Sequence, residues 1–247
     1  MLELKTSESE YNSQTLSQIV KNNFKAAAVF EKYNLDFCCK GNKFLSAACV
    51  EKGVDERKIL SELQRIKTYQ NSSINYEEWS LDFLIDYIVN THHSYVRRMI
   101  PIISEHVNKV ASVHGQNHPE LKEIARIFSV VYKDLKQHMM KEEEILFPHI
   151  KYLVKSKANG TRIESPYFGT VQNPIRLMES EHQNAGDELF EIRRLSNSYK
   201  VPEDACNTFS VTFQELKEFE EDLHKHVHLE NSILFPKSIQ LEAELSC

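Results

Sequence analysis

Apolar residues recur at alternating steps of three and four along four long segments of the chain. This spacing gathers them on one face of a helix and predicts four amphipathic helices. The four stripes are Ile85, Val89, His93, Val96 and Ile100; Ile124, Phe128, Val131, Leu135, His138, Glu142 and Ile145; Ile175, Met178, His182, Ala185, Leu189 and Ile192; and Leu216, Phe219, Leu223, His226, Glu230 and Ile233. We expect the second and fourth helices to end at Pro148 and Pro236, and Pro101 to kink the first.

The first part of the chain carries shorter helical patterns separated by breaks. The predicted short helices lie near residues 15–20, 26–30, 43–50 and 55–67, the last with Asp55 as its N-cap. Residues 68–75, TYQNSSIN, are polar and rich in turn formers, so we expect a linker there. The pattern therefore predicts an all-α protein with a small helical domain at residues 1–75 and a helical bundle at 76–247.

Two segments of the predicted bundle repeat each other. Residues 138–148 and 226–236 both read H-x-x-x-E-x-x-I-L-F-P and begin 88 residues apart, and His93 and His182 are 89 residues apart. A helix hairpin used twice explains both offsets. Two such hairpins make an antiparallel four-helix bundle that carries four histidines at similar depth.

The stripe histidines and glutamates predict a metal site. A glutamate four residues after a histidine lies on the same helix face, one turn away. One histidine on an apolar face is usually a core residue, but four of them with two buried carboxylates need compensation by cations. Six ligands suit two metals bridged by the glutamates, and mixed imidazole and carboxylate ligation favours iron, with manganese or zinc as alternatives. The predicted ligands are His93, His138, Glu142, His182, His226 and Glu230.

The other polar residues near these stripes receive no ligand role. His92 adjoins His93, but the stripe spacing and the repeat offset favour His93. His228 follows His226 by two residues, so it should point away from the site. We expect the remaining polar neighbours to be solvated or without a ligand role: His106, His114, His118, His149, His224, Glu143, Glu144, Glu179 and Glu181.

Composition narrows the class of protein. The 247 residues are 41% hydrophobic and 27% charged, with a formal net charge of −6. No run approaches the roughly 18 apolar residues of a membrane span, the first residues lack a secretory pattern, and an acidic chain is poorly suited to nucleic acid. Five cysteines, two of them adjacent, do not form a secreted disulfide framework, so we expect the cytoplasm.

The adjacent cysteines, Cys38 and Cys39, precede Gly41 in a predicted loop. A disulfide between neighbours strains the peptide. The pair could instead bind a metal, exchange thiols with a partner or meet the bundle site, and the alternative is a structural role as small, half-buried residues. Cys49 is expected in the core, and Cys206 and Cys247 carry no expected role.

These motifs together resemble a known family. Asn34 to Gly41, NLDFCCKG, is similar to the N-terminal domain of the bacterial di-iron proteins that repair iron–sulfur clusters, the ScdA/YtfE type. Residues 138–148, 178–182 and 226–231 resemble the family's haemerythrin-like domain. The likeness covers nearly the whole chain in the same order, although Lys40-Gly41-Asn42 replaces the Gly-Gly that many relatives carry.

The resemblance implies a fold, a cofactor and a function. It implies an oxo- or hydroxo-bridged di-iron centre held by the same six residues, and it aligns the family's paired cysteines with Cys38 and Cys39. It also implies that the chain restores iron–sulfur clusters damaged by nitric oxide or hydrogen peroxide, with damaged cluster proteins as partners and a homodimer as the assembly. Two alternatives remain at this point: an enzyme that reduces nitric oxide at the di-iron site, and a module that binds or senses oxygen or nitric oxide.

Overall fold

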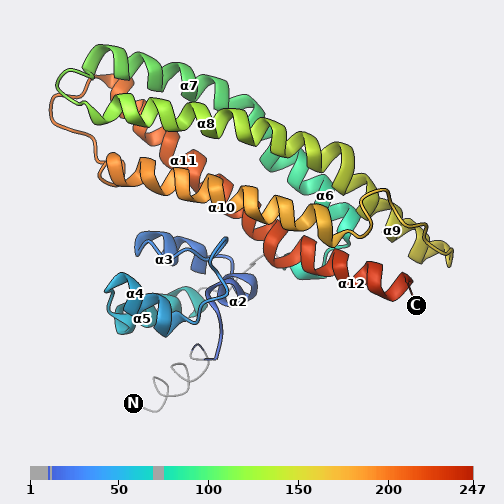
Figure 1. The fold of residues 1–247 in the computed structure, drawn as a ribbon. Coiled ribbons are helices and arrows are strands. Elements are labelled where there is room, and N and C mark those ends of the chain that lie inside the picture. Colours follow the sequence, from blue (N-terminus) through green and yellow to red (C-terminus); the bar gives the residue numbers. More distant parts are fainter. Residues whose placement is uncertain (1–10, 12, 69–74, 247) are drawn as a thin grey trace. The chain divides into compact units, whose positions relative to one another are not determined.

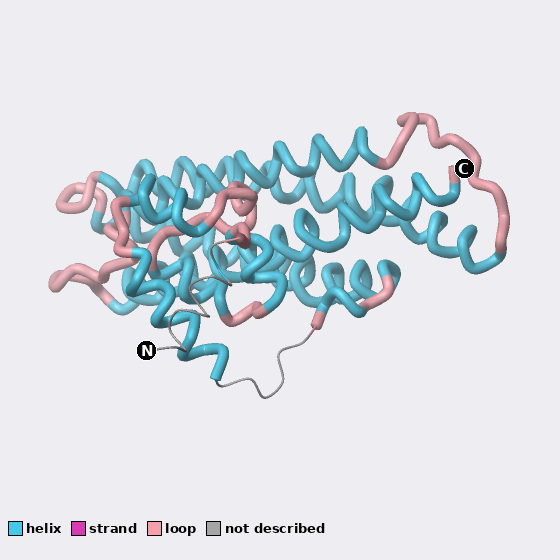
Figure 2. Tube along the Cα trace, turned by 90° about the horizontal axis from the view of Figure 1, so that it is seen from below, coloured by secondary structure: helices cyan, strands magenta, loops and turns pink. Residues whose placement is uncertain are grey.

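The computed structural model describes residues 11, 13–68 and 75–246, and helices make up most of them (Figure 2). Within these ranges the backbone forms no strand beyond one isolated antiparallel bridge between Thr15 and Phe44. The all-α prediction is therefore confirmed. Residues 69–74 of the expected linker lie outside the described residues.

Contacts divide the chain into two compact units. The first holds Met1–Ser80 together with Val227–Pro236, and the second holds Leu81–His226 together with Lys237–Cys247. Residues 227–236 thus belong to the same compact unit as the N-terminal residues, although along the chain they are part of a long C-terminal helical run. Each unit buries large apolar side chains of its own, such as Phe30 in the first and Phe128 in the second.

The first unit is built from short helices. They are α2 (Leu16–Asn22), α3 (Ala26–Lys32), α4 (Leu45–Lys52), α5 (Glu56–Thr68) and the 3₁₀ turn η1 (Tyr76–Glu78). Thr15 and Gln18 form a reciprocal capping box at the start of α2, and the Asp55 side chain accepts the N–H of Arg57, as expected of an N-cap. The four predicted short helices are therefore present, each within a few residues of its expected place.

The second unit contains most of a four-helix bundle (Figure 1). Its successive helical runs are antiparallel, as the repeat predicted. The four runs are α6 (Leu81–Ile88), η2 (Val89–His93) and α7 (Ser94–His114); α8 (Glu120–Lys141), η3 (Glu142–Leu146) and α9 (Phe147–Asn159); α10 (Gln172–Leu195); and α11 (Asn207–Leu229), η4 (Glu230–Leu234) and α12 (Phe235–Leu245).

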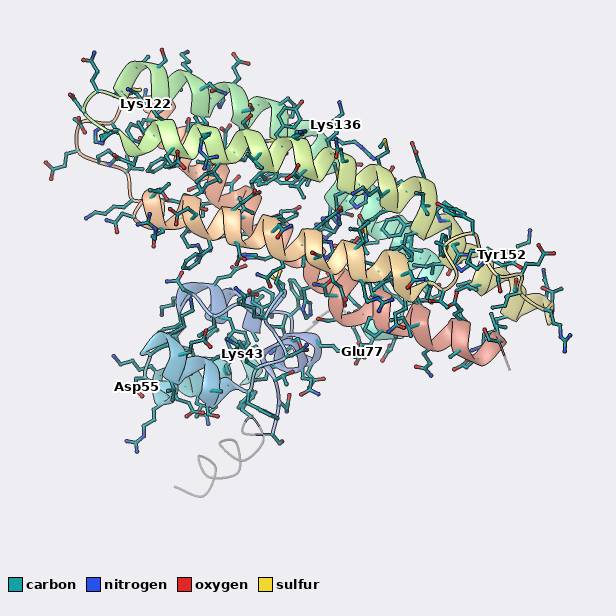
Figure 3. All side chains as sticks on the ribbon, in the orientation of Figure 1. Lys43, Asp55, Glu77, Lys122, Lys136 and Tyr152 are labelled. Carbon is teal, nitrogen blue, oxygen red and sulfur yellow. The ribbon has the colours of Figure 1, made fainter. Side chains whose placement is uncertain are left out.

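The predicted stripes form the bundle core. α8 packs against both α7 and α10, and the Phe219 ring on α11 lies 5.6 Å from that of Phe128 on α8. The third stripe is buried along its whole length. Many outward-facing positions are polar, as Lys122 and Lys136 on α8 illustrate (Figure 3). No helix in the described ranges combines the length and apolarity needed to cross a membrane.

The expectation that Pro148 and Pro236 end their helices is wrong. Each is the second residue of a further helix, α9 or α12. A wide π-helical turn precedes each one, in which the N–H of Phe147 or Phe235 reaches back five residues to the carbonyl of a glutamate. Proline has no N–H to donate, and the first turn of a helix tolerates that loss. Pro101 lies inside α7, which runs unbroken from Ser94 to His114.

Candidate metal centre

The six predicted ligands come from all four helical runs of the bundle. His93 ends η2, His138 and His182 lie within α8 and α10, and His226 lies within α11. Glu142 and Glu230 open the π-helical turns η3 and η4, one turn after His138 and His226. The solvent-exposed fraction of each of the six is 2% or less. Polar side chains buried this deeply require partners.

Their donor atoms form two overlapping groups. Each group has two histidines of its own and shares both glutamates with the other group. The groups are His93 with His226, and His138 with His182, each completed by Glu142 and Glu230. Within a group, one donor atom of every residue lies within 4.8 Å of the others. The structure therefore brings all six predicted residues together in the pattern of two metal positions with shared carboxylates.

The spacing of the imidazole nitrogens suits metal ligation. The Nε2 atoms of His93 and His226 are 3.1 Å apart, and those of His138 and His182 are 3.0 Å apart. Two nitrogen ligands held at right angles, about 2.1 Å from one ion, lie about 3.0 Å from each other. Each histidine pair thus matches two adjacent ligands of a single ion.

The Glu142 carboxylate divides its oxygens between the two pairs. Its Oε1 lies 3.3 Å from His138 Nε2, and its Oε2 lies 3.4 Å from His93 Nε2. Both oxygens are buried without a hydrogen-bond partner. Burial alone would raise the pKa of this carboxyl, but attraction from His138 and His93 outweighs it and holds the pKa well below its usual range. A buried anion with both oxygens unsatisfied fits a carboxylate that bridges two cations.

This donor set fits non-haem iron. Four imidazoles and two carboxylates would provide four ligands to each ion if each glutamate bridges, which leaves positions for small molecules. The described part of the centre has no cysteine, whereas a closed structural zinc site is usually rich in cysteine. Two irons held by these six residues remain our proposal, as does the role of each residue as a ligand.

Three of the six residues lie at π-helical turns, which the stripe pattern did not predict. In η2, η3 and η4 the residue after the turn donates its N–H to a carbonyl five positions earlier. Such a turn inserts one extra residue and rotates the side chains beyond it. Ile145, expected on the apolar stripe, is consequently 36% exposed, while Leu146 and Phe147 are buried. The sequence feature that could have indicated the turns at Glu142 and Glu230 is the proline six residues after each glutamate.

A carboxylate orients the ring of His93. His93 Nδ1 donates to Glu143 Oε1 at 2.5 Å, and Arg97 forms an ion pair with the same carboxylate. These hydrogen bonds hold the pKa of Glu143 below its usual range. With its proton on Nδ1, His93 presents the Nε2 lone pair to the centre. Glu143, predicted to face solvent, therefore supports a predicted ligand.

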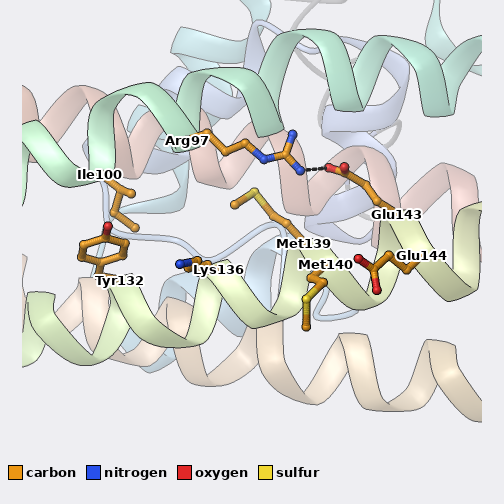
Figure 4. A pocket seen from close by; sticks show the side chains of 8 residues that line it. All are labelled: Arg97, Ile100, Tyr132, Lys136, Met139, Met140, Glu143 and Glu144. Carbon is orange, nitrogen blue, oxygen red and sulfur yellow. Dashed lines mark hydrogen bonds and ion pairs between the residues drawn. The ribbon is translucent and has the colours of Figure 1, made fainter.

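Glu143 and Arg97 also line a pocket of about 350 Å³ between α7 and α8 (Figure 4). Met139, Met140 and Lys136 contribute to the same wall. Because Glu143 contacts His93 on one side and this pocket on the other, the pocket reaches the second layer of side chains around the centre.

His138 has a matching support on the opposite helix pair. Its Nδ1 donates to Glu181 Oε2 at 3.0 Å, and Lys141 pairs with the other oxygen of Glu181. Burial raises the pKa of Glu181, but His138 and Lys141 outweigh it and lower the pKa overall. Each histidine pair thus contains one ring held by a carboxylate that is itself paired with a cation. No ligand role was assigned to Glu181, and its supporting contact was not anticipated.

The choice between His92 and His93 agrees with the geometry. His93 belongs to a candidate group and His92 does not. His92 is buried, pairs through Nδ1 with Asp222 at 3.0 Å and stacks on the ring of His226. His92 therefore packs beside a predicted ligand without joining the donor set.

The other histidines expected to be solvated are half-buried and belong to neither donor group. Each has a protein partner rather than water alone: His106 with Glu215, His114 with Cys206, His118 with Asp204, His149 with Glu242 and His224 with Glu220. Within the first unit His228 is fully buried against the rings of Phe24 and Phe37, and burial lowers its pKa to about 4. His228 is not in either histidine group, as expected.

The cysteine pair lies in a loop of the first unit. Cys38 is buried, Cys39 is half-buried, and their Sγ atoms are 3.7 Å apart, so no disulfide joins them. Contact with Cys39, burial and the nearby Asp36 raise the pKa of Cys38 well above its usual value. Cys49 is buried as expected, and burial raises its pKa to about 11.

Two family matches cover most of the chain. Residues 12–67 match the ScdA_N family, described as a domain of unknown function (DUF542). Residues 84–238 match the hemerythrin HHE cation binding domain. Both matches follow the order expected from the sequence motifs.

Curated relatives align with nearly the whole chain. The iron-sulfur cluster repair protein YtfE of Yersinia pestis (strain Pestoides F) is 32% identical over 233 residues, which are 94% of this chain and 100% of that protein. The YtfE of Yersinia pseudotuberculosis serotype IB (strain PB1/+) shows the same identity over the same length.

Proposed function

The chain belongs to the YtfE family of hemerythrin-type iron–sulfur cluster repair proteins, and we propose that it repairs damaged iron–sulfur clusters by supplying iron from its buried centre. The observation that carries this proposal is the pair of overlapping His/Glu groups that share Glu142 and Glu230. The shared glutamates support two ions held close together, in keeping with a hemerythrin domain. Damaged cluster proteins are the expected targets.

The residues of the centre suit a store that can release its ions. Imidazole and carboxylate ligands can both be protonated, unlike a closed thiolate cage. Glu143 and Glu181 orient His93 and His138 so that their Nε2 atoms face the centre. Bound iron supplies both the cargo for repair and an ion that changes its oxidation state. The protein contributes the burial that separates this centre from bulk water.

We further propose that Cys38 and Cys39 take part in delivery rather than storage. They are absent from both His/Glu groups, and one of them is half-buried, within reach of a partner. A protein that only carries oxygen needs no such pair. The small helical domain, proposed to span residues 1–75, would thus receive iron or dock on the target, and the bundle at 76–247 would hold the iron.

The test is the double variant Cys38→Ser with Cys39→Ser. It should retain the bundle iron of the parent chain yet fail to reactivate an enzyme whose iron–sulfur cluster was damaged by nitric oxide or peroxide. Cys206→Ser is the matched control, because it removes an exposed thiol from the second unit. Full repair by the double variant would contradict the proposed role of the pair.

The compartment, the assembly and the use of nitric oxide are further parts of the proposal. We propose a reducing, cytoplasmic setting, supported by the cysteine pattern, and a homodimer, supported by the family resemblance. Reduction or sensing of nitric oxide is an alternative use of the same centre. Steady production of nitrous oxide by the iron-loaded protein with a reductant would favour that use over repair.

A further inference from the structure

We propose that Asp36, Cys38 and Cys39 form a second metal site, which takes a single divalent transition-metal ion that accepts thiolate ligands. It is separate in residues from the six His/Glu ligands of the bundle. One donor atom from each of the three residues lies within 4.8 Å of the other two. The site itself requires nothing of the proposed repair function; only the identity of its natural occupant, ferrous iron in transit, rests on that function.

The distances between the donor atoms match one coordination polyhedron. The two Sγ atoms are 3.7 Å apart, and Cys38 Sγ lies 3.4 Å from Asp36 Oδ1. Two thiolates about 2.3 Å from one ion in a tetrahedral site lie about 3.8 Å from each other. A thiolate and a carboxylate oxygen on the same ion lie about 3.5 Å apart. These two separations match two edges of a tetrahedron around a zinc-sized or ferrous-sized ion, and the third pair of donor atoms, from Asp36 and Cys39, lies within 4.8 Å.

The same separation disfavours the redox alternative. A disulfide needs the two sulfurs at about 2.05 Å, and neighbouring residues reach that distance only with strain. The loop holds the sulfurs at 3.7 Å instead. Its geometry therefore suits a shared ion better than a bond between the sulfurs.

The loop is held in place by a dense set of contacts. Asp36 Oδ1 accepts the backbone N–H groups of Cys38 at 3.1 Å and of Cys39 at 2.9 Å. The Asn231 side chain donates to the Cys38 carbonyl at 3.3 Å within the first unit. A Cβ on Gly41 would lie 2.1 Å from the Phe37 carbonyl oxygen, so only glycine allows the chain to fold back here. The donor atoms are therefore arranged before any ion arrives, which lowers the cost of binding.

The charges of the cluster call for a cation. Two thiols and a carboxylate converge in a largely buried loop, and contact with Cys39, burial and the nearby Asp36 raise the pKa of Cys38, which keeps this thiol protonated. A divalent ion would reverse that balance, because thiolates rather than thiols bind metals and the protons leave as the ion enters. Three protein ligands leave one tetrahedral position open. Cys39 and Asp36 are half-buried, so solvent or a donor from a partner protein can fill that position.

The test is a titration of the full, iron-loaded chain with cobalt(II) as the probe, without oxygen. We expect one cobalt per chain with a thiolate-to-cobalt charge-transfer band, a signature that His and Glu ligands cannot produce. Cys39→Ser should abolish the band, and Asp36→Asn should weaken cobalt binding by about tenfold or more. Asparagine keeps an oxygen to accept the loop N–H groups, so Asp36→Asn isolates the lost charge. Cys206→Ser should leave the band unchanged.

Three results would overturn the site: no thiolate band in the parent chain, a band that persists in Cys39→Ser, or a band that disappears in Cys206→Ser. Unchanged bundle iron in each variant shows that the chain has folded. The readout is also independent of repair. A band without repair activity would contradict the proposed function alone, and repair without a band would contradict this site alone.

Discussion

The same sequence motif occurs at residues 138–148 and 226–236, but the two copies contact different parts of the molecule. Both copies place a histidine and, four residues on, a glutamate at the metal centre, and both continue through a π-helical turn into a helix with proline at its second position. They differ at the residue after the glutamate, where Glu143 holds His93 and Asn231 holds the Cys38 carbonyl. The residues that the two copies share therefore include the candidate metal ligands and the π-helical turn. The residue that differs decides which neighbour each copy contacts.

The two copies also differ in how exposed the residue two positions after the histidine is. Met140, two residues after the first histidine, is 50% exposed, whereas His228 at the matching position is fully buried. In the first unit His228 packs against Phe24 and Phe37 and bonds through Nδ1 with Ser232 Oγ at 3.2 Å. The two copies thus share the donor residues of the centre, while the second copy also packs against N-terminal residues of the first unit.

The largest effect should come from the glutamates that the two copies share. Glu142→Leu or Glu230→Leu removes a carboxylate of both donor groups, and we expect iron to fall from two per chain to about one or fewer. Elemental analysis of purified protein measures this directly. Glu144→Leu is the control, because Glu144 is exposed next to the centre and belongs to neither group. Unchanged iron in both glutamate variants would refute the ligand assignment.

The second-largest effect should be on how stability depends on pH, which His228 of the second copy influences and Met140 of the first copy does not. The pKa of His228 is about 4 in the folded chain, whereas the ordinary value, expected in the unfolded chain, is 6.5. As the pH falls, the unfolded chain therefore binds a proton at His228 before the folded chain does. Stability from this residue is complete above pH 6.5 and is lost between about 6.5 and 4, by roughly 3 kcal/mol. His228→Met installs the residue of the first copy and should remove this part of the acid sensitivity.

Chemical denaturation of metal-free protein across that pH range measures the difference between the two chains, since their other titrating groups are the same. Equal acid sensitivity in His228→Met and the parent chain would show that His228 is not buried as a neutral ring.

Exchange at the position after the glutamate should have a smaller effect. Glu143→Asn installs the residue of the second copy, frees His93 Nδ1, and should weaken iron binding by about 10- to 100-fold. Competition with a chelator gives the affinity. Asn231→Ala, the counterpart in the other copy, should leave that affinity unchanged because Asn231 contacts the cysteine loop. If both variants lost iron equally, the division of roles between the copies would be wrong.

The smallest effect should come from Arg97→Ala. Arg97 is half-exposed, so its pair with Glu143 is worth less than about 1 kcal/mol. We expect iron affinity to change by less than about fivefold, with a larger loss at low salt than at high salt. A loss as large as that of Glu143→Asn would mean that the cation, rather than the carboxylate, positions His93.

Periodicity in the sequence predicts much of this arrangement. The stripe spacing and the 88-residue repeat predicted the bundle and the residues that now form both donor groups. The supporting side chains could not be predicted in the same way. Glu143 comes directly after a buried residue, at a position that a regular helix would present to solvent, and the π-helical turn that begins at Glu142 changes the direction of its side chain.

Contacts between segments that are far apart along the chain also could not be predicted from the sequence pattern. The burial of His228 depends on Phe24 and Phe37, about 200 residues earlier, and no pattern along its own helix encodes them. The Asp36 contact with the cysteines is local, and an aspartate two residues before a cysteine pair is a signal that could have been read. Position along a helix thus predicts which residues meet in the donor groups better than it predicts the side chains that hold them in place.

The central claim is that two irons share the glutamates of both copies. Mössbauer spectroscopy of the purified protein, combined with iron analysis, tests it most directly. The overlapping donor groups predict two irons per chain in the bundle that are magnetically coupled through shared ligands. A single isolated iron per chain, or zinc in its place, would contradict the claim.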